Sequence, residues 1–119
     1  MTDTKMTGGF SAKPKTAAFA RQIVRQIDAL GPTKKDLKAQ ASFAIKRKFL
    51  WLWTYGHTAD GTLYMTVLLD HPVESDQFHY VKQVGPHRWN HHVVVKSHDQ
   101  IKAPAVRDLL AAGYAFAGR

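Results

Sequence analysis

Cysteine is absent from this chain of 119 residues. Its absence excludes disulfide bonds, thiolate chemistry and the zinc sites that depend on cysteine ligands. No run approaches the roughly 18 consecutive apolar residues that a membrane-spanning helix needs. The first residues, Met-Thr-Asp-Thr-Lys-Met-Thr-Gly-Gly, contain no apolar segment of the kind found in a secretory signal. We therefore expect a cytoplasmic protein with no membrane among its partners.

Acidic residues are also scarce, with 9 Asp and Glu against 17 Lys and Arg, for a net charge of +8. The excess is confined to one part of the chain: residues 1–48 contain 11 basic and three acidic side chains, and residues 49–119 contain six of each. A one-sided positive field attracts polyanions such as nucleic acid. A net charge of this size also keeps a small domain soluble without any partner. The charge alone does not decide between these two interpretations.

The length of the chain fits one compact domain. Hydrophobic residues make up 45% of it and include six Phe, four Tyr and three Trp, which is enough apolar material for a core. Residues 1–15 are polar and contain Gly8, Gly9 and Pro14, so they are predicted to form a flexible tail. Residues 16–119 are predicted to form a single α+β domain.

Two segments have the apolar spacing of an amphipathic helix. One runs over residues 16–30, with Thr16 as the expected N-cap. The other runs from Pro104 to about Ala117, since proline is favoured in the first helical turn. Residues 33–40 form a charged connector with room for one helical turn.

Strand patterns fill the region between these helices. Residues 41–54 predict two strands joined by a basic turn at Lys46–Lys48, and residues 62–69 alternate and predict another. Residues 78–84 and 89–96 predict a hairpin. This order predicts an antiparallel sheet of four to five strands, with the N-terminal and C-terminal helices packed on one face.

Five strings along the chain carry a resemblance: Phe43-Ala44-Ile45, Arg47-Lys48-Phe49, Val81 to Pro86, Arg88 to Val93 and Leu109 to Tyr114. Together they resemble the bacterial domain-of-unknown-function family 5655 over roughly residues 16–117. A departure is Gly113, where the family is expected to have alanine. The family name implies no activity, but the resemblance implies an accessory binding role, because such domains occur alone or attached to proteins resembling DNA-restriction nucleases. The predicted order is also similar to the frataxin and iron-chaperone sandwich, although the acidic ridge that hard cations require is missing here.

A basic and aromatic group is formed by Lys46, Arg47, Lys48, Trp51 and Trp53, and Arg88 and Trp89 lie near it if the two hairpins share one sheet. Lysine and arginine neutralise phosphates, and exposed rings stack on bases, so such a group on an open sheet face can bind single strands. In the alternative interpretation, Trp51 and Trp53 cover the sheet against the helices while Lys46–Lys48 form a solvated turn. We favour this placement of the two tryptophans in the core.

The function that these patterns favour is that of a small binding or accessory module for an anionic ligand, either nucleic acid or a small acidic molecule. Its basic side chains would bind through charge-assisted hydrogen bonds, and its tryptophan by stacking. No cofactor, catalytic residue or metal ligand is predicted. The predicted ligand-binding residues are Arg47, Lys48, Lys82, Arg88, Trp89 and His91.

Two other functions remain open. One is a small enzyme or metal-binding protein built on the segment His87–His92, because imidazoles bind transition metals and act as general bases. Strand alternation places His91 and His92 on opposite faces, which prevents this pair from converging simply. The other is a homodimeric protein-interaction subunit joined through a sheet edge or an aromatic face. In the first of these alternatives, the enzyme, the acidic side chains that would orient His91 or His92 as a base are Asp70, Glu74 and Asp76.

Overall fold

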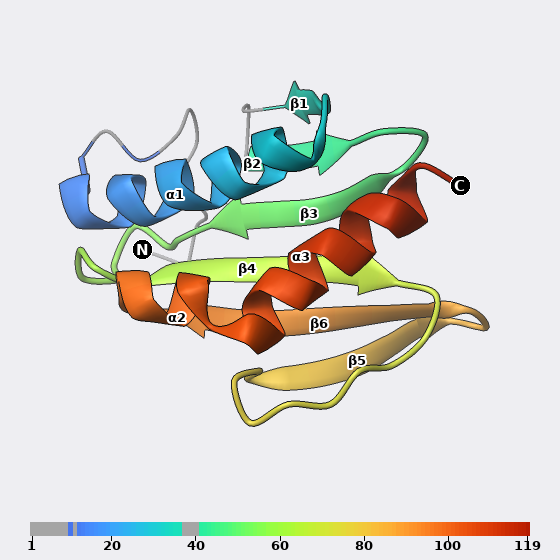
Figure 1. Cartoon of the computed structure of the whole chain (residues 1–119). Helices are drawn as coiled ribbons and strands as arrows, with labels where there is room; N and C mark the ends of the chain where they lie inside the picture. Colours follow the sequence, from blue (N-terminus) through green and yellow to red (C-terminus); the bar gives the residue numbers. More distant parts are fainter. Residues whose placement is uncertain (1–9, 11, 37–40) are drawn as a thin grey trace.

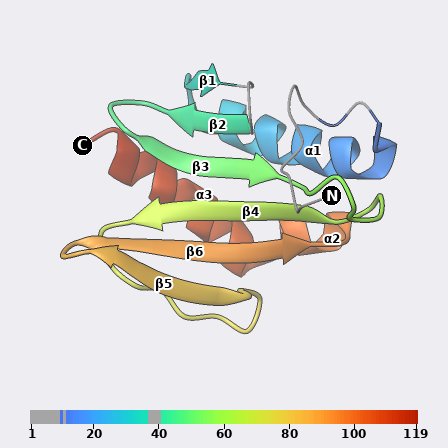
Figure 2. The same cartoon turned by 180° about the vertical axis from the view of Figure 1, so that it is seen from behind.

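The computed structural model describes residues 10, 12–36 and 41–119. Within them, six strands form one antiparallel sheet, and three helices lie on one of its faces (Figure 1). Figure 2 shows the opposite face, on which the described residues place no helix. The predicted α+β class with both terminal helices on one face is confirmed. The sheet has six strands, however, where four to five were expected.

The strands are β1 (Lys34–Asp36), β2 (Ala41–Ala44), β3 (Lys48–Trp53), β4 (Leu63–Leu69), β5 (Tyr80–Gly85) and β6 (Arg88–Val95). The helices are α1 (Pro14–Leu30), α2 (His98–Lys102) and α3 (Pro104–Ala117). The spatial order of the strands is β1-β2-β3-β4-β6-β5, so β5 forms one edge and β1 the other. Both predicted strand pairs, β2–β3 and β5–β6, are present. None of the described helices combines the length and apolar character needed to cross a membrane.

The additional strand is β1, in the segment expected to contain a helical turn. Lys34 to Asp36 pair with Ser42 to Ala44 of β2, and all three residues of β1 are exposed. Short, charged strands are common at sheet edges because they discourage further pairing. Residues 37–40 of the predicted connector lie outside the described residues. Backbone pairing with β2 determines the conformation of Lys34–Asp36, and the local sequence pattern does not predict this pairing.

The first helix begins at Pro14, so Thr16 is not its N-cap. The carboxylate of Asp60, in the loop between β3 and β4, accepts hydrogen bonds from the backbone amides of Lys15 (3.2 Å) and Thr16 (3.0 Å). Loss of some hydration raises the pKa of the exposed Asp60, but these hydrogen bonds outweigh it and lower that pKa below its ordinary value. Residues 1–9 and 11 of the predicted tail lie outside the described residues, whereas Lys13 is buried and its ammonium donates to the Tyr55 carbonyl at 2.6 Å.

The core lies between the sheet and the helices. Alternate residues of β4, including Met65 and Val67, are 0% exposed and face the helices. Gly113 of α3 allows the helix to lie close to the sheet, because a Cβ atom there would be 2.6 Å from Val67 Cγ1 and 3.0 Å from Phe49 Cδ2. The helix face of the sheet beneath α3 is therefore filled by packed side chains.

A bulge in β3 separates the buried aromatic residue of this strand from its tryptophans. The register between β2 and β3 shifts at this point, and the consecutive residues Phe49 and Leu50 are both 0% exposed. Trp51 and Trp53 follow on the open face, half-buried, where Trp53 stacks on Tyr64 with ring centres 5.9 Å apart. The prediction that both tryptophans belong to the core is wrong, because the bulge changes the phase of the strand and Phe49 covers the sheet instead.

Candidate functional site

Aromatic side chains from four adjacent strands share the open face of the sheet. The register places Trp51 of β3 opposite Thr66 of β4, which pairs with His92 of β6, which pairs with Tyr80 of β5. Because neighbouring strands lie about 4.8 Å apart, this row spans about 14 Å. Tyr80 is 49% exposed at the edge, and the other rings are half-buried. We call the following residues the aromatic face: Trp51, Trp53, Tyr64, Tyr80 and His92.

The rings of the aromatic face are held by one another. Tyr80 stacks on His92 with ring centres 4.2 Å apart and 25° between the planes, and Trp53 stacks on Tyr64 at 21°. The Thr66 hydroxyl lies 2.9 Å from His92 Nδ1 and fixes the imidazole. Between the two stacks lies a hollow of about 200 Å³. Stacked rings on both sides give this hollow apolar walls that suit a flat ring such as a nucleobase.

Two predicted lysines project from the same open face, toward one end of the sheet. Lys82 pairs with Asn90, the neighbour of the inward-facing His91, and therefore lies on the open side. Lys48 pairs with Ala44 across β2 and β3, at the first residue of β3. Both lysines are exposed. The structure thus places two cations that are distant in sequence on one face, on strands that β4 and β6 separate.

Two predicted arginines lie at this same end of the sheet, Arg47 between β2 and β3 and Arg88 at the first residue of β6. The guanidinium carbons of Arg47 and Arg88 lie 4.8 Å and 5.1 Å from the ring centre of Phe116, near the C-terminal end of α3. Arg47 also donates to the Arg119 carbonyl at 3.1 Å, and the negative end of a helix favours such cations. Among the described residues, no Asp or Glu side chain forms an ion pair with Arg47 or Arg88. We call the following residues the basic end: Lys46, Arg47, Lys48, Lys82 and Arg88.

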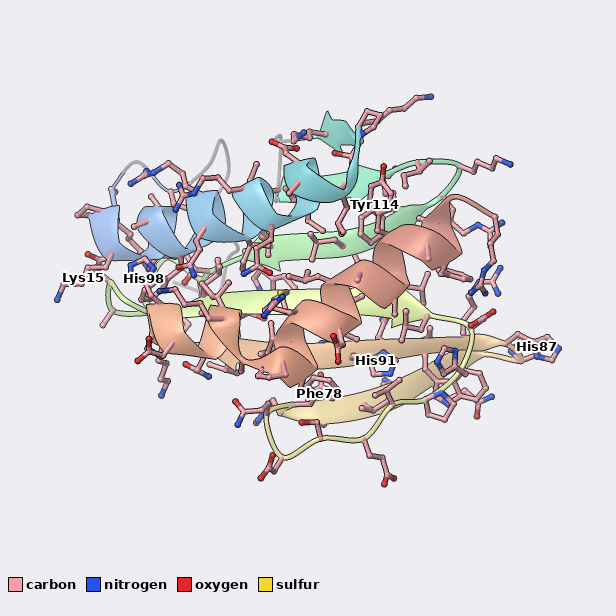
Figure 3. The ribbon with its side chains drawn as sticks, viewed as in Figure 1. Lys15, Phe78, His87, His91, His98 and Tyr114 are labelled. Atoms are coloured by element: carbon pink, nitrogen blue, oxygen red, sulfur yellow. The ribbon has the colours of Figure 1, made fainter. Side chains whose placement is uncertain are left out.

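His91, by contrast, lies inside the molecule at 0% exposure. Its Nδ1–H donates to the Val67 carbonyl at 3.2 Å, and its Nε2 accepts from the Val73 backbone amide at 3.0 Å. Figure 3 shows His91 beside Phe78, whose ring meets it edge-on with centres 5.9 Å apart. Burial lowers the pKa of His91, and the hydrogen bond to Val67 offsets only part of that effect. This neutral imidazole ties the loop after β4 to β6.

The six predicted site residues are therefore divided between two faces. Lys48 and Lys82 lie on the open face at the basic end, and the guanidinium groups of Arg47 and Arg88 lie against Phe116 of α3 at that same end. Trp89 is half-buried on the helix side beside the buried His91. Sequence reasoning missed Tyr80 as a site residue. Its signal was present, because Tyr80 and Lys82 are two residues apart in one strand and therefore share a face.

The three histidines of the segment His87–His92 do not gather at one place. His87 lies exposed in the turn between β5 and β6, His91 is buried and His92 lies on the open face. In the part of the chain that the structure describes, no three His, Cys, Asp or Glu side chains are arranged to hold a metal ion. Asp70 bonds to His71 at 2.8 Å and to Arg119 at 2.9 Å. The hydrogen bond from His71 lowers the pKa of Asp70, and the charge of Arg119 adds to the effect.

Comparison with known proteins agrees with the resemblance seen in the sequence strings. No curated protein and no solved structure matches the chain. A family model described as "Domain of unknown function (DUF5655)" matches residues 6–117. The match includes every strand and helix described above. The chain therefore belongs to this family, Domain of unknown function (DUF5655).

Proposed function

We propose that this domain is an accessory module that binds single-stranded nucleic acid across the open face of its sheet. The observation that carries the proposal is the strand register, which places Trp51 and Tyr80 in one row and Lys48 and Lys82 toward one end of the same face. Bases stack on the aromatic face while phosphates meet the basic end. Stacking on aromatic side chains contributes about 1–3 kcal/mol per base.

The shape of this face favours a single strand over a duplex. Bases must be unstacked from a helix before their flat faces reach protein rings. The open face is a broad sheet surface, and no described helix projects from it toward a groove (Figure 2). A single strand lying across β3, β4, β6 and β5 meets rings on successive strands.

Preorganisation supports the same conclusion. The Tyr80 ring rests on His92, and His92 is held by Thr66, so little side-chain freedom is lost when a base stacks on this ring. At the basic end, Arg47 and Arg88 are supported by the Phe116 ring. The cations and rings are therefore positioned by rigid elements.

Fluorescence polarisation with a labelled 12-nucleotide single strand, in DNA and RNA forms and as a duplex, tests this proposal at about 50 mM salt. We expect micromolar affinity with a preference for the single strands. Trp51→Ala and Tyr80→Ala should each weaken binding about tenfold, in keeping with the loss of one stacked base. Val84→Ala is the matched control, because Val84 is an apolar residue of the same edge strand with 50% exposure.

Unchanged affinity in Trp51→Ala and Tyr80→Ala would overturn the proposal. So would the absence of binding by the unmodified domain at low salt. Sedimentation of the free protein completes the experiment. A dimer that Trp51→Ala dissociates, in a protein without nucleic-acid affinity, would instead identify the aromatic face as the interface between two copies.

A further inference from the structure

A second hollow lies on the helix side of the sheet, between α1 and the strands β2 and β3. Figure 1 shows α1 running in front of this edge of the sheet. The hollow has a volume of about 410 Å³, within the range of small-molecule sites. Its floor is apolar and includes the partly exposed Ala17 and Val24 beside the buried Phe43 and Leu52, while the cations Arg21, Arg25 and Lys35 also line it.

The cations that line this hollow differ in their partners. Lys35 forms an ion pair with Asp28 at 3.0 Å. Arg21 and Arg25 are four residues apart on α1, on one side of the helix, and both are exposed. Considering the described residues alone, no carboxylate pairs with either arginine. Within the described part of the chain, two neighbouring guanidinium groups thus lie beside an apolar floor without a carboxylate paired to either.

We propose that this groove binds a free single-chain fatty acid. The hydrocarbon chain lies on the apolar floor, and the carboxylate meets Arg21 and Arg25. Guanidinium groups match a carboxylate with paired, charge-assisted hydrogen bonds, and this contact removes the repulsion between two like charges one turn apart. A nucleic-acid strand does not suit this groove, because its sugars and phosphates would cover the apolar floor with polar groups.

The affinity for a fatty acid should depend on the length of its hydrocarbon chain. Each methylene group removed from water tightens binding about fourfold until the groove is full. An alcohol of the same chain length keeps the apolar contact and loses the contact with the arginines. The site is independent of the open face, which lies on the other side of the sheet, so the two proposals stand or fall separately.

Isothermal titration with fatty acids of eight to fourteen carbons, each below its micelle concentration, measures this dependence. We expect laurate to bind at least tenfold more tightly than dodecanol. The double variant Arg21→Glu with Arg25→Glu should weaken laurate binding at least tenfold. Arg107→Glu is the matched control, because Arg107 is an exposed arginine of another helix and lies outside this groove.

Val24→Trp supplies an independent variant, since Val24 lines the groove and a larger side chain there displaces the hydrocarbon chain. Thermal melting of each variant establishes that it is folded. Unchanged laurate affinity in the folded double variant would overturn the proposal. Equal affinity for all chain lengths would do the same, as would binding to vesicles containing phosphatidylglycerol without binding to monomeric acids.

Discussion

The ring of Tyr80 lies against the imidazole of His92, with 4.2 Å between the ring centres and 25° between the planes. Tyr80 belongs to the edge strand β5 and is 49% exposed, whereas His92 lies on the adjacent strand β6 and is held at Nδ1 by the Thr66 hydroxyl. One exposed ring of the aromatic face is therefore supported from below by a fixed one. Because one side of the Tyr80 ring is covered by His92, the other side is the one that faces solvent.

Changing His92 tests this support. In His92→Ala the stack is lost, and single-strand affinity should fall about threefold, because an aromatic pair contributes roughly 0.5–1.5 kcal/mol. In His92→Phe the stack is kept, and affinity should remain near that of the unmodified domain. Polarisation titrations of both variants make the comparison. Equal affinities for the two variants would show that the stack does not position Tyr80.

Removing Arg47 and Lys48 together tests the basic end. Arg47→Ala with Lys48→Ala should weaken single-strand binding about tenfold without unfolding the domain, because two phosphate contacts are lost. The control removes two exposed cations from the helix side, Lys102→Ala with Arg107→Ala, so that the net charge is the same. Equal losses in both double variants would mean that only total charge matters.

Gly113 tests the close approach of α3 to the sheet. Alanine there improves helix propensity by about 1 kcal/mol. Its Cβ would lie 2.6 Å from Val67 and 3.0 Å from Phe49, two fully buried side chains with little room to move. Overpacking of this kind costs about 1–3 kcal/mol, so Gly113→Ala should lower the free energy of unfolding by about 1 kcal/mol.

Urea unfolding measures this difference. Gly118→Ala is the control at the end of the same helix, where the nearest atom to a Cβ lies at 3.7 Å and no loss is expected. A Gly113→Ala variant that is more stable than the original would show that the helix shifts without cost.

The buried His91 makes stability depend on pH. Well above pH 6.5, the ordinary pKa, neither the folded nor the unfolded state binds a proton at this residue, and its contribution is complete. Below pH 6.5 the unfolded state takes up a proton that the folded state does not, because the folded pKa is lowered by burial. The free energy of unfolding therefore falls as the pH falls.

Denaturant unfolding of His91→Gln between pH 7.5 and pH 5.5 checks this prediction. The variant cannot titrate at this position and should show a weaker pH dependence than the unmodified protein. It should also lose about 1–3 kcal/mol at pH 7.5, because the Val73 amide is left without its histidine acceptor. The exposed His87→Gln serves as the control. An identical pH profile for all three proteins would refute the role of His91.

Local periodicity was sufficient to predict most of the fold. The spacing of apolar residues in α1 and α3 and the alternation in β4 depend on neighbouring residues alone, and the structure confirms these elements. The strand β1 and the capping of α1 by Asp60 depend on contacts with distant segments. Neither contact leaves a mark in the local pattern, so neither was predicted.

The candidate site was predicted only in part, because some of its features also depend on contacts between distant segments. Lys48 and Arg88 belong to the two predicted turns, and the structure places them next to those turns, at the first residues of β3 and β6. The bulge at Phe49 reversed the expected faces of Trp51 and Trp53, because one extra residue changes the side of every residue after it. His91 was predicted to contact a ligand, but the Val73 loop that covers it is reached only through the tertiary fold.

The salt dependence of single-strand binding tests the central claim most directly. Four phosphate contacts, at Arg47, Lys48, Lys82 and Arg88, give a slope of about −3 in a plot of log affinity against log salt concentration, since each contact contributes about −0.7. Affinity should therefore fall about 50-fold between 50 and 200 mM salt. A slope near zero, or no binding at 50 mM salt, would contradict the account.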